Sequence, residues 1–125
     1  HSRAIEALFR NQLFCPPGLE ELRERTGIDE ATLKRILNAL RQQQKLVRVE
    51  GDLIFHRDAI ERAREILVDH LEREGRLESV KFKYLLDTTR KFALPLLDHF
   101  DHVGVTRRAG NTRFLKQPRR AADSH

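Results

Sequence analysis

Residues 46–55 read Leu-Val-Arg-Val-Glu-Gly-Asp-Leu-Ile-Phe, and this stretch decides how the first half of the chain folds. Two runs rich in β-formers flank a short turn at Gly51, a pattern typical of a β-hairpin. The residues before it have helical spacing instead, over 3–13, 19–26 and from the N-cap Asp29 to about residue 43, with a Pro-Pro-Gly break at 16–18. Three helices followed by a hairpin predict a winged helix-turn-helix.

The same pattern returns about 60 residues later. The apolar positions of 5–13 recur at 63–71 with an offset of 58, and those of 22–40 recur at 82–100 with an offset of 60. The hairpin Leu46–Phe55 recurs as Val105–Phe114 with an offset of 59. Changes in loop length explain offsets that drift by one or two residues. We therefore predict a mostly α fold with small β-hairpin wings, built as two tandem winged helix-turn-helix domains.

The repeat also predicts the domain limits. The first domain covers 1–56 and serves as a spacer or support, the second covers 57–117, and 118–125 form a basic flexible tail. In the second domain we expect helices over 58–74 and near 80–86, and a third starting at Thr88 or Thr89. Pro95 lies inside that third helix and should kink it near Lys91. The second hairpin should run from 105 to 115, with its turn at 109–111.

Composition excludes several classes of protein. The chain has 125 residues, 39% of them apolar and 34% charged, and its net charge is +5. A single cysteine, Cys15, excludes a disulfide framework and a cysteine-based zinc finger. No apolar run approaches the length of a membrane span, and no signal-peptide pattern is found, so we expect no membrane partner. We expect a monomeric, cytoplasmic piece of a longer protein, with the native or tag origin of its terminal residues left open.

The positive charge is concentrated in the second copy. Net charge is +1 over residues 1–56, −2 over 57–80 and +6 over 81–125. Cations alternate with aromatic residues at 81–84, two threonines and two cations begin a helix at 88–91, and the second wing is basic. A basic face of this kind favours a phosphate-rich partner. The candidate RNA-binding residues are Lys81, Lys83, Tyr84, Thr88, Thr89, Arg90, Lys91, Arg107, Arg108, Asn111, Thr112 and Arg113.

The aromatic residues in this region divide between core and surface. Phe82 aligns with Leu22 in the repeat, so we expect it in the core, whereas Tyr84 aligns with Glu24 and should be exposed. An exposed tyrosine beside two lysines can stack on an unpaired base. Each basic stretch alone is equally compatible with ordinary solvated surface. Their expected convergence on one face is what favours nucleic-acid binding.

Residues 82–101 read FKYLLDTTRKFALPLLDHFD, and residues 104–108 read GVTRR. Together these two stretches resemble the last winged-helix domain of the bacterial selenocysteine-specific translation elongation factors (SelB). The proline within the third helix, Pro95, is uncommon among winged helices and strengthens the resemblance. The first copy matches only as a generic winged helix in the position where that family also has one.

The resemblance implies a function. In that family the last winged helix binds the stem-loop (SECIS) in selenoprotein mRNA that recodes a UGA stop codon. The whole factor delivers selenocysteinyl-tRNA to the ribosome, and its GTPase part, which uses GTP and Mg²⁺, is absent from this sequence. The implied partner is therefore an mRNA stem-loop, and the ribosome and the tRNA are partners only through the whole factor. No cofactor is implied for the chain itself.

The sequence also leaves alternatives to weigh. We find no phosphate-binding loop, dinucleotide motif, catalytic triad or HExxH pattern, so we expect no enzyme activity. Residues 98–102 read DHFDH and could suggest a metal, but two surface histidines explain the pattern more simply, and we predict neither a metal site nor a catalytic residue. A DNA-binding transcription regulator is the main alternative, and a protein-interaction module is a second one that the charge distribution argues against.

Overall fold

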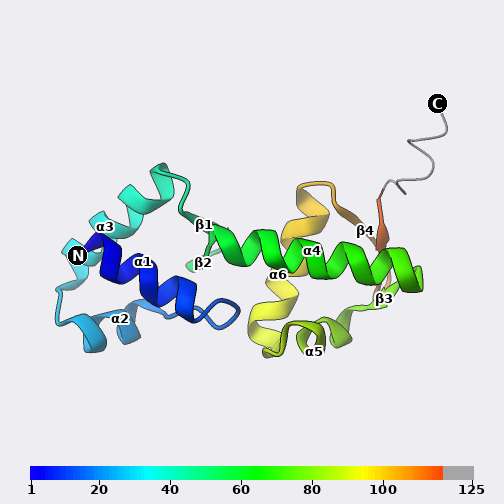
Figure 1. The fold of residues 1–125 in the computed structure, drawn as a ribbon, viewed down its shortest axis with the longest axis horizontal. Helices are drawn as coiled ribbons and strands as arrows, with labels where there is room; N and C mark the ends of the chain where they lie inside the picture. The colour runs from blue at the N-terminus through cyan, green and yellow to red at the C-terminus, as the bar shows by residue number, and fades with distance from the viewer. Residues whose placement is uncertain (117–125) are drawn as a thin grey trace. The chain divides into compact units, whose positions relative to one another are not determined.

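The computed structural model describes residues 1–116 and confirms a mostly helical fold with small β-hairpin wings (Figure 1). The first winged helix has the order helix, helix, helix, hairpin. Its elements are α1 (Ser2–Asn11), α2 (Leu19–Thr26), α3 (Glu30–Gln42), β1 (Leu46–Glu50) and β2 (Leu53–His56). Strands β1 and β2 pair antiparallel, as the two β-rich runs around Gly51 predicted.

The second winged helix repeats this order with one addition. Its elements are α4 (Arg57–Glu74), β3 (Leu77–Glu78), the 3₁₀ turn η1 (Ser79–Lys81), α5 (Phe82–Leu86), α6 (Arg90–His102), β4 (Thr106–Ala109) and β5 (Thr112–Leu115). The two-residue strand β3 was not predicted, because two residues carry no periodic signal. It pairs with β5, so the sheet has the order β3-β5-β4. Helix α6 continues through Pro95 from Arg90 to His102.

The chain divides into two compact units between Glu61 and Arg62, inside α4. The repeat had placed the limit after His56, where α4 begins. The predicted tail over 118–125 lies outside the described residues.

Each unit has its own core, and the two cores use equivalent positions. In the first, Ile5, Phe9, Leu22, Leu33 and Leu40 are at most 1% exposed. The counterparts in the second are equally buried, and they are Ala63, Leu67, Phe82, Ala93 and Phe100. The burial of Phe82 was predicted from its alignment with Leu22. The internal repeat therefore reflects one packing scheme used twice.

The backbone corrects the predicted alignment of the two hairpins. Lys45 N–H donates to the Leu40 carbonyl, and Val105 N–H donates to the Phe100 carbonyl, so Lys45 corresponds to Val105 with an offset of 60. Leu46 therefore corresponds to Thr106, not to Val105. The offset falls to 59 only at a bulge between Arg48 and Glu50, which makes the first hairpin one residue longer. Residue identity alone could not locate that bulge.

Helix α4 begins at a buried histidine. The Asp58 N–H donates to His56 Nδ1 at 2.9 Å, so the imidazole caps the first turn. His56 Nε2 lies 2.8 Å from Glu6 Oε2, and this hydrogen bond lowers the pKa of Glu6 below its ordinary value. The contact ties α1 to the start of α4 within the first unit. No helix among residues 1–116 is long and apolar enough to cross a bilayer.

Candidate nucleic-acid interface

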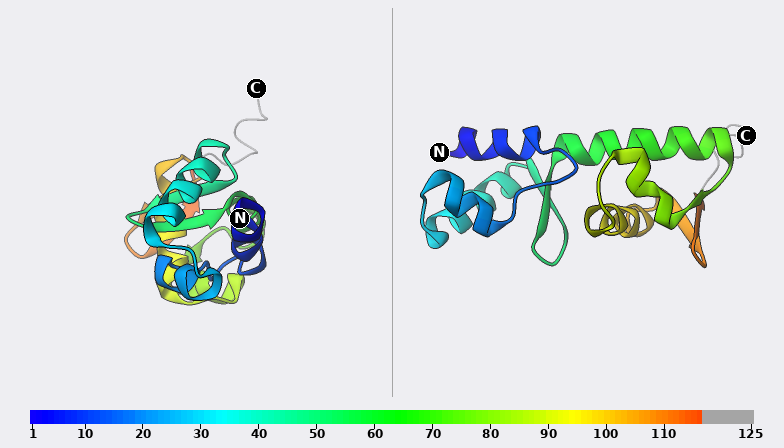
Figure 2. Two further views of the ribbon diagram at one scale, coloured as in Figure 1. Left: turned by 90° about the vertical axis from the view of Figure 1, so that its left-hand side faces the viewer. Right: turned by 90° about the horizontal axis from the view of Figure 1, so that it is seen from below.

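The structure exposes most of the candidate residues. Lys81, Tyr84, Thr89, Arg90, Lys91, Arg107, Arg108 and Asn111 are exposed, and Lys83, Thr88 and Thr112 are half-buried. Arg113 alone among them is buried. The candidates belong to two segments of the second winged helix, residues 81–91 (η1, α5 and the start of α6) and the β4–β5 hairpin, whose course can be followed in Figures 1 and 2.

The first place is the helix-start cluster, defined here as Lys83, Thr88, Thr89, Arg90 and Lys91. Backbone hydrogen bonds hold it together, since Thr88 N–H donates to the Lys83 carbonyl at 2.9 Å. Asp87 closes α5 in a left-handed conformation with φ of 54°, which reverses the chain so that α6 can begin. The cluster is therefore preorganised by the short turn between the two helices.

Helices α3 and α6, the third helix of each winged helix, begin differently. In the first copy the Asp29 carboxylate caps α3 by accepting from the Thr32 N–H at 3.1 Å and from its hydroxyl at 2.7 Å. These hydrogen bonds lower the pKa of Asp29 and keep an anion at that helix start. In the second copy Thr89 occupies the N-cap of α6 but makes no side-chain cap hydrogen bond. A phosphate oxygen suits the site that Asp29 fills in the first copy.

The second place is the wing cluster, defined here as Arg107, Arg108, Asn111 and Thr112. The Arg107 guanidinium lies 4.4 Å from the centre of the Phe114 ring, and Arg108 Nε donates to the Gly110 carbonyl at 2.8 Å. The turn is anchored because Ser79 donates to the Asn111 carbonyl through both its N–H and its hydroxyl, each at 2.8 Å. The two exposed arginines therefore sit on an anchored hairpin.

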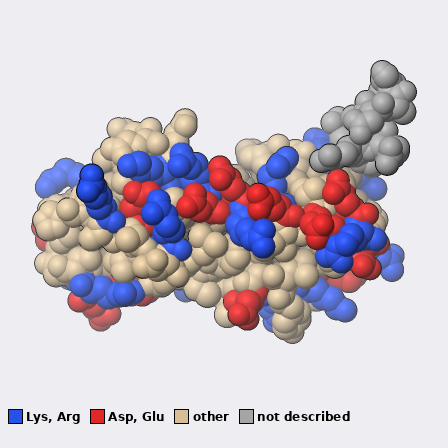
Figure 3. All heavy atoms as spheres, viewed as in Figure 1, with Lys and Arg blue, Asp and Glu red and all other residues tan. Residues whose placement is uncertain are grey.

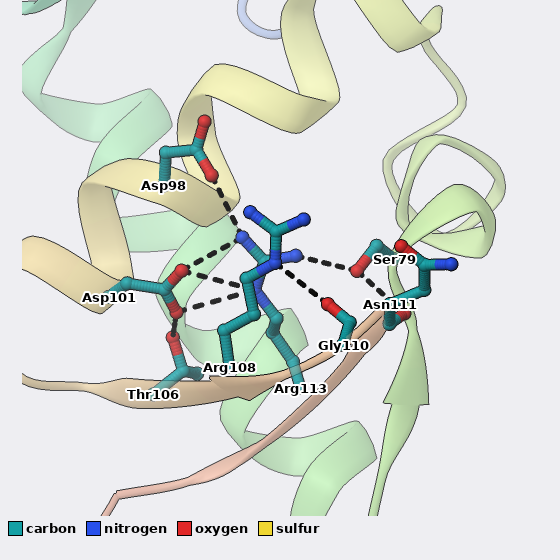
Figure 4. A network of polar contacts seen from close by, with 8 residues as sticks. All are labelled: Ser79, Asp98, Asp101, Thr106, Arg108, Gly110, Asn111 and Arg113. Atoms are coloured by element: carbon teal, nitrogen blue, oxygen red, sulfur yellow. Dashed lines mark hydrogen bonds and ion pairs between the residues drawn. The ribbon is translucent and has the colours of Figure 1, made fainter.

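The prediction that Arg113 contacts RNA is wrong, because this residue is buried and has a structural role (Figure 4). Its side chain is 2% exposed, and its Nη2 lies 2.8 Å from both Asp98 and Asp101. Its Nη1 donates to the Ser79 hydroxyl at 2.6 Å, and Asp101 also accepts from Thr106 at 2.6 Å. All three partners of the guanidinium lie within the domain, which leaves it unavailable to a phosphate. The repeat held a signal for this, since Arg113 aligns with the apolar Ile54.

The two clusters lie at different points along α6. The wing packs on α6 near Asp98 and Asp101, whereas Arg90 is the first residue of that helix. Asp98 lies eight positions after Arg90 in α6, which is about 12 Å along the helix axis. The surface therefore offers two groups of cations at separate points, which suits an extended polyanion better than one isolated phosphate.

Tyr84 remains the best-placed aromatic residue for stacking. Its side chain is 71% exposed, and Lys83 Nζ lies 5.1 Å from the centre of its ring. Tyr84 and Lys81 line one surface hollow of about 540 Å³, together with polar side chains that include His70 and Glu78. A ring held open to solvent beside two lysines can accept a base on its face.

The exposed and half-buried basic candidates differ from several cations of α4 in their ion pairing. On α4, Arg62 pairs with Glu65 and Arg73 with Asp69, and acidic and basic side chains alternate along this helix (Figure 3). Within residues 1–116, by contrast, Lys81, Lys83, Arg90, Lys91, Arg107 and Arg108 make no ion pair with a carboxylate. Unpaired cations can exchange their counterions for phosphates without first breaking an internal contact.

The acidic and histidine residues at the end of α6 do not gather as metal ligands. Asp98 and Asp101 face Arg113. Burial, with a smaller contribution from His102, lowers the pKa of His99 below its ordinary value. Among the described residues no three histidine, cysteine or acidic side chains come together as a metal site would require.

Comparison with known proteins agrees with this geometry. Residues 69–115 match the family model described as "Elongation factor SelB, winged helix". The selenocysteine-specific elongation factor of Escherichia coli strain K12 is 29% identical over 89% of the chain. The solved mRNA-binding domain of E. coli SelB in complex with SECIS RNA matches 93% of this chain and 97% of its own length, with a TM-score of 0.77 and 26% identity. Residues 69–115 therefore match a SelB winged helix, and most of the chain is similar to SelB proteins.

Further SelB relatives agree. The selenocysteine-specific elongation factor of Desulfomicrobium baculatum is 22% identical over 90% of the chain. A solved bacterial factor, EF-Sec, shares the fold with a TM-score of 0.70 and 21% identity. The chain spans about 18% of the length of its curated SelB relatives, and it matches an RNA-binding winged-helix region of SelB, not a catalytic domain.

Proposed function

We propose that this chain is the mRNA-binding part of a selenocysteine-specific elongation factor and that its second winged helix binds a SECIS stem-loop. The match to nearly the whole SECIS-bound domain of E. coli SelB carries this proposal. The unpaired cations of the helix-start and wing clusters support it, because they supply the phosphate contacts that such binding needs.

The whole factor, by analogy with its relatives, would bring selenocysteinyl-tRNA to a ribosome paused at UGA. This chain would hold the factor beside that codon and so raise its local concentration there. GTP and Mg²⁺ belong to the rest of such a factor, and the chain itself needs no cofactor and catalyses no reaction. We propose that it acts as a monomer in the cytoplasm, where translation occurs.

The two clusters suggest how the stem-loop is held. The major groove of A-form RNA is too deep and narrow for α6 to read base pairs, so specificity should come from unpaired bases. Arg90, Lys91 and the start of α6 would bind phosphates on one side of those bases. Arg107 and Arg108 would bind phosphates at the second point, and Tyr84 is placed to stack on an unpaired base.

A gel-shift comparison tests the proposal. The chain should shift an RNA stem-loop from a selenoprotein mRNA at concentrations where a DNA duplex of equivalent sequence stays free. A preference for the duplex would favour the alternative of a DNA-binding transcription regulator and contradict the proposal. Absence of binding to both would favour a protein-interaction module.

Binding should weaken steeply as salt is added. Between four and six of the unpaired cations should contact phosphates, so the slope of log K against log salt should lie between about −3 and −5. Fluorescence anisotropy with a labelled stem-loop would give this slope when it is measured between about 50 and 200 mM salt. A flat response would exclude the phosphate contacts assigned to the two clusters.

Tyr84→Ala should discriminate between RNAs. Loss of one stacked base should cost about 1 to 3 kcal/mol for an RNA that presents an unpaired base. Binding to a fully paired stem should stay nearly unchanged. The check is titration of the variant against a stem-loop with and without its unpaired bases, with Tyr84→Phe as the control that keeps the ring. Equal losses on both RNAs would show that Tyr84 supports packing instead of stacking.

A further inference from the structure

The first winged helix has a basic hollow that sequence composition concealed. The hollow has a volume of about 650 Å³ and lies where the end of α3 meets the start of β1. It is lined by Asn38, Arg41, Gln42, Gln44, Leu46, Val47, Arg48 and Arg57. Three arginines from three different elements therefore surround one cavity, and none of its lining residues carries a carboxylate.

These arginines are not engaged in ion pairs. Within residues 1–116, the side chains of Arg48 and Arg57 make no hydrogen bond or ion pair, and Arg41 contacts only the Asn38 amide oxygen, at 3.3 Å. Other basic side chains of the same unit, such as Arg23, Arg25 and Lys34, each pair with a glutamate. Three uncompensated like charges around one hollow create a positive potential that attracts an anion.

In the second copy, carboxylates occupy the equivalent positions at the end of the third helix. Arg41 corresponds to Asp101 and Asn38 corresponds to Asp98, the two carboxylates that Arg113 holds. The first copy has Ile54 in place of Arg113, so its charge at this position is positive and lacks an internal partner. The two copies share a fold but invert the charge at the end of the third helix.

We propose that this hollow, which we call the arginine hollow, binds the sugar-phosphate backbone of RNA without regard to sequence. Guanidinium groups bind phosphate oxygens through paired hydrogen bonds. The amides of Asn38, Gln42 and Gln44 can both donate and accept, which suits a ribose 2′-hydroxyl beside a phosphate. No aromatic side chain lines the hollow, so bases have no stacking surface there. This site is independent of stem-loop recognition by the second winged helix.

The experiment uses the full 125-residue chain, labelled with ¹⁵N and titrated with a ten-nucleotide oligouridylate that cannot form a stem-loop. The backbone signals of residues 38–48 report on the arginine hollow and its surroundings in the first winged helix. The triple variant Arg41→Gln/Arg48→Gln/Arg57→Gln should weaken the binding measured from those signals at least tenfold. It should also reduce the magnitude of the salt slope by about 2, at roughly 0.7 per contact.

The matched control is Arg23→Gln/Arg25→Gln/Lys34→Gln, which removes the same charge from the same domain. It should leave the binding within about twofold of the unmodified chain, which is the scale of a rim electrostatic effect. Equal losses in the two triple variants would overturn the proposal, since only net charge would then matter. A hexaglutamate peptide that shifts the same signals as strongly as the RNA would overturn it in favour of an acidic protein partner.

A separate measurement keeps this proposal distinct from the proposed function. The stem-loop preference of the triple variant is read from the signals of residues 83–91. If that preference persists while oligouridylate binding at residues 38–48 is lost, the arginine hollow is a second RNA site. If the stem-loop preference is absent from the unmodified chain while residues 38–48 still bind oligouridylate, the proposed function fails and the arginine hollow stands.

Discussion

Replacing Arg113 with methionine should destabilise the second winged helix by about 1 to 3 kcal/mol, because it leaves the partly exposed Asp98 and Asp101 carboxylates and the Ser79 hydroxyl without their shared partner. Arg113 is 2% exposed and links Asp98 and Asp101 of α6 to Ser79 beside the wing. Urea unfolding followed by NMR measures this, since signals of residues 77–115 should vanish at lower urea than in the unmodified chain. Signals of residues 5–55 provide an internal reference.

Arg76→Met is the matched control, because Arg76 is exposed and has no ion pair within the described residues. It should change stability by less than about 0.5 kcal/mol. A quadruple variant offers a further check by replacing the network with neutral residues: Asp98→Asn, Asp101→Asn, Thr106→Leu and Arg113→Ile. It should recover most of the loss, because apolar packing can replace a buried ion pair. An Arg113→Met chain as stable as the control would refute the structural role.

Arg90→Ala should weaken stem-loop binding roughly ten- to a hundredfold without unfolding the domain. A charged hydrogen bond to a phosphate is worth about 1.5 to 3 kcal/mol, and Arg90 is exposed at the start of α6 with no ion pair among residues 1–116. The measurement is a titration of the variant against a labelled stem-loop at fixed salt. Thermal unfolding of the same sample shows whether the fold is retained.

The control for Arg90 is Arg73→Ala, an exposed arginine of the second unit that pairs with Asp69 on α4. It removes the same charge far along the chain from both clusters and should change affinity less than threefold, since an exposed pair is worth about 0.2 to 1 kcal/mol. Equal effects of the two variants would reduce the role of Arg90 to general charge. Unchanged binding by Arg90→Ala would move the phosphate contacts to the wing cluster.

Sequence periodicity determined the architecture of this chain. Apolar residues at helical spacing, Gly51 and Gly110 at the hairpin turns, and Asp29 at a helix start predicted the main elements closely. These features are local, because they depend on backbone preferences and on the choice of one buried face. The internal repeat and the stretch from Phe82 to Arg108 can also be read directly from the sequence. The SelB resemblance that this stretch carries is confirmed by the comparisons.

Which charged side chains are paired, and which lie together on the surface, could be determined only from the tertiary structure. The sequence counted Arg113 among the RNA-binding cations, but the fold buries it between α6 and the sheet, where two carboxylates neutralise it. The net charge of the first domain, summed from the sequence, is only +1, yet the fold gathers Arg41, Arg48 and Arg57 around one hollow. Net charge sums over a segment, whereas recognition depends on which cations lie together and which are already paired. Those two properties arise only when residues distant in sequence are brought into contact.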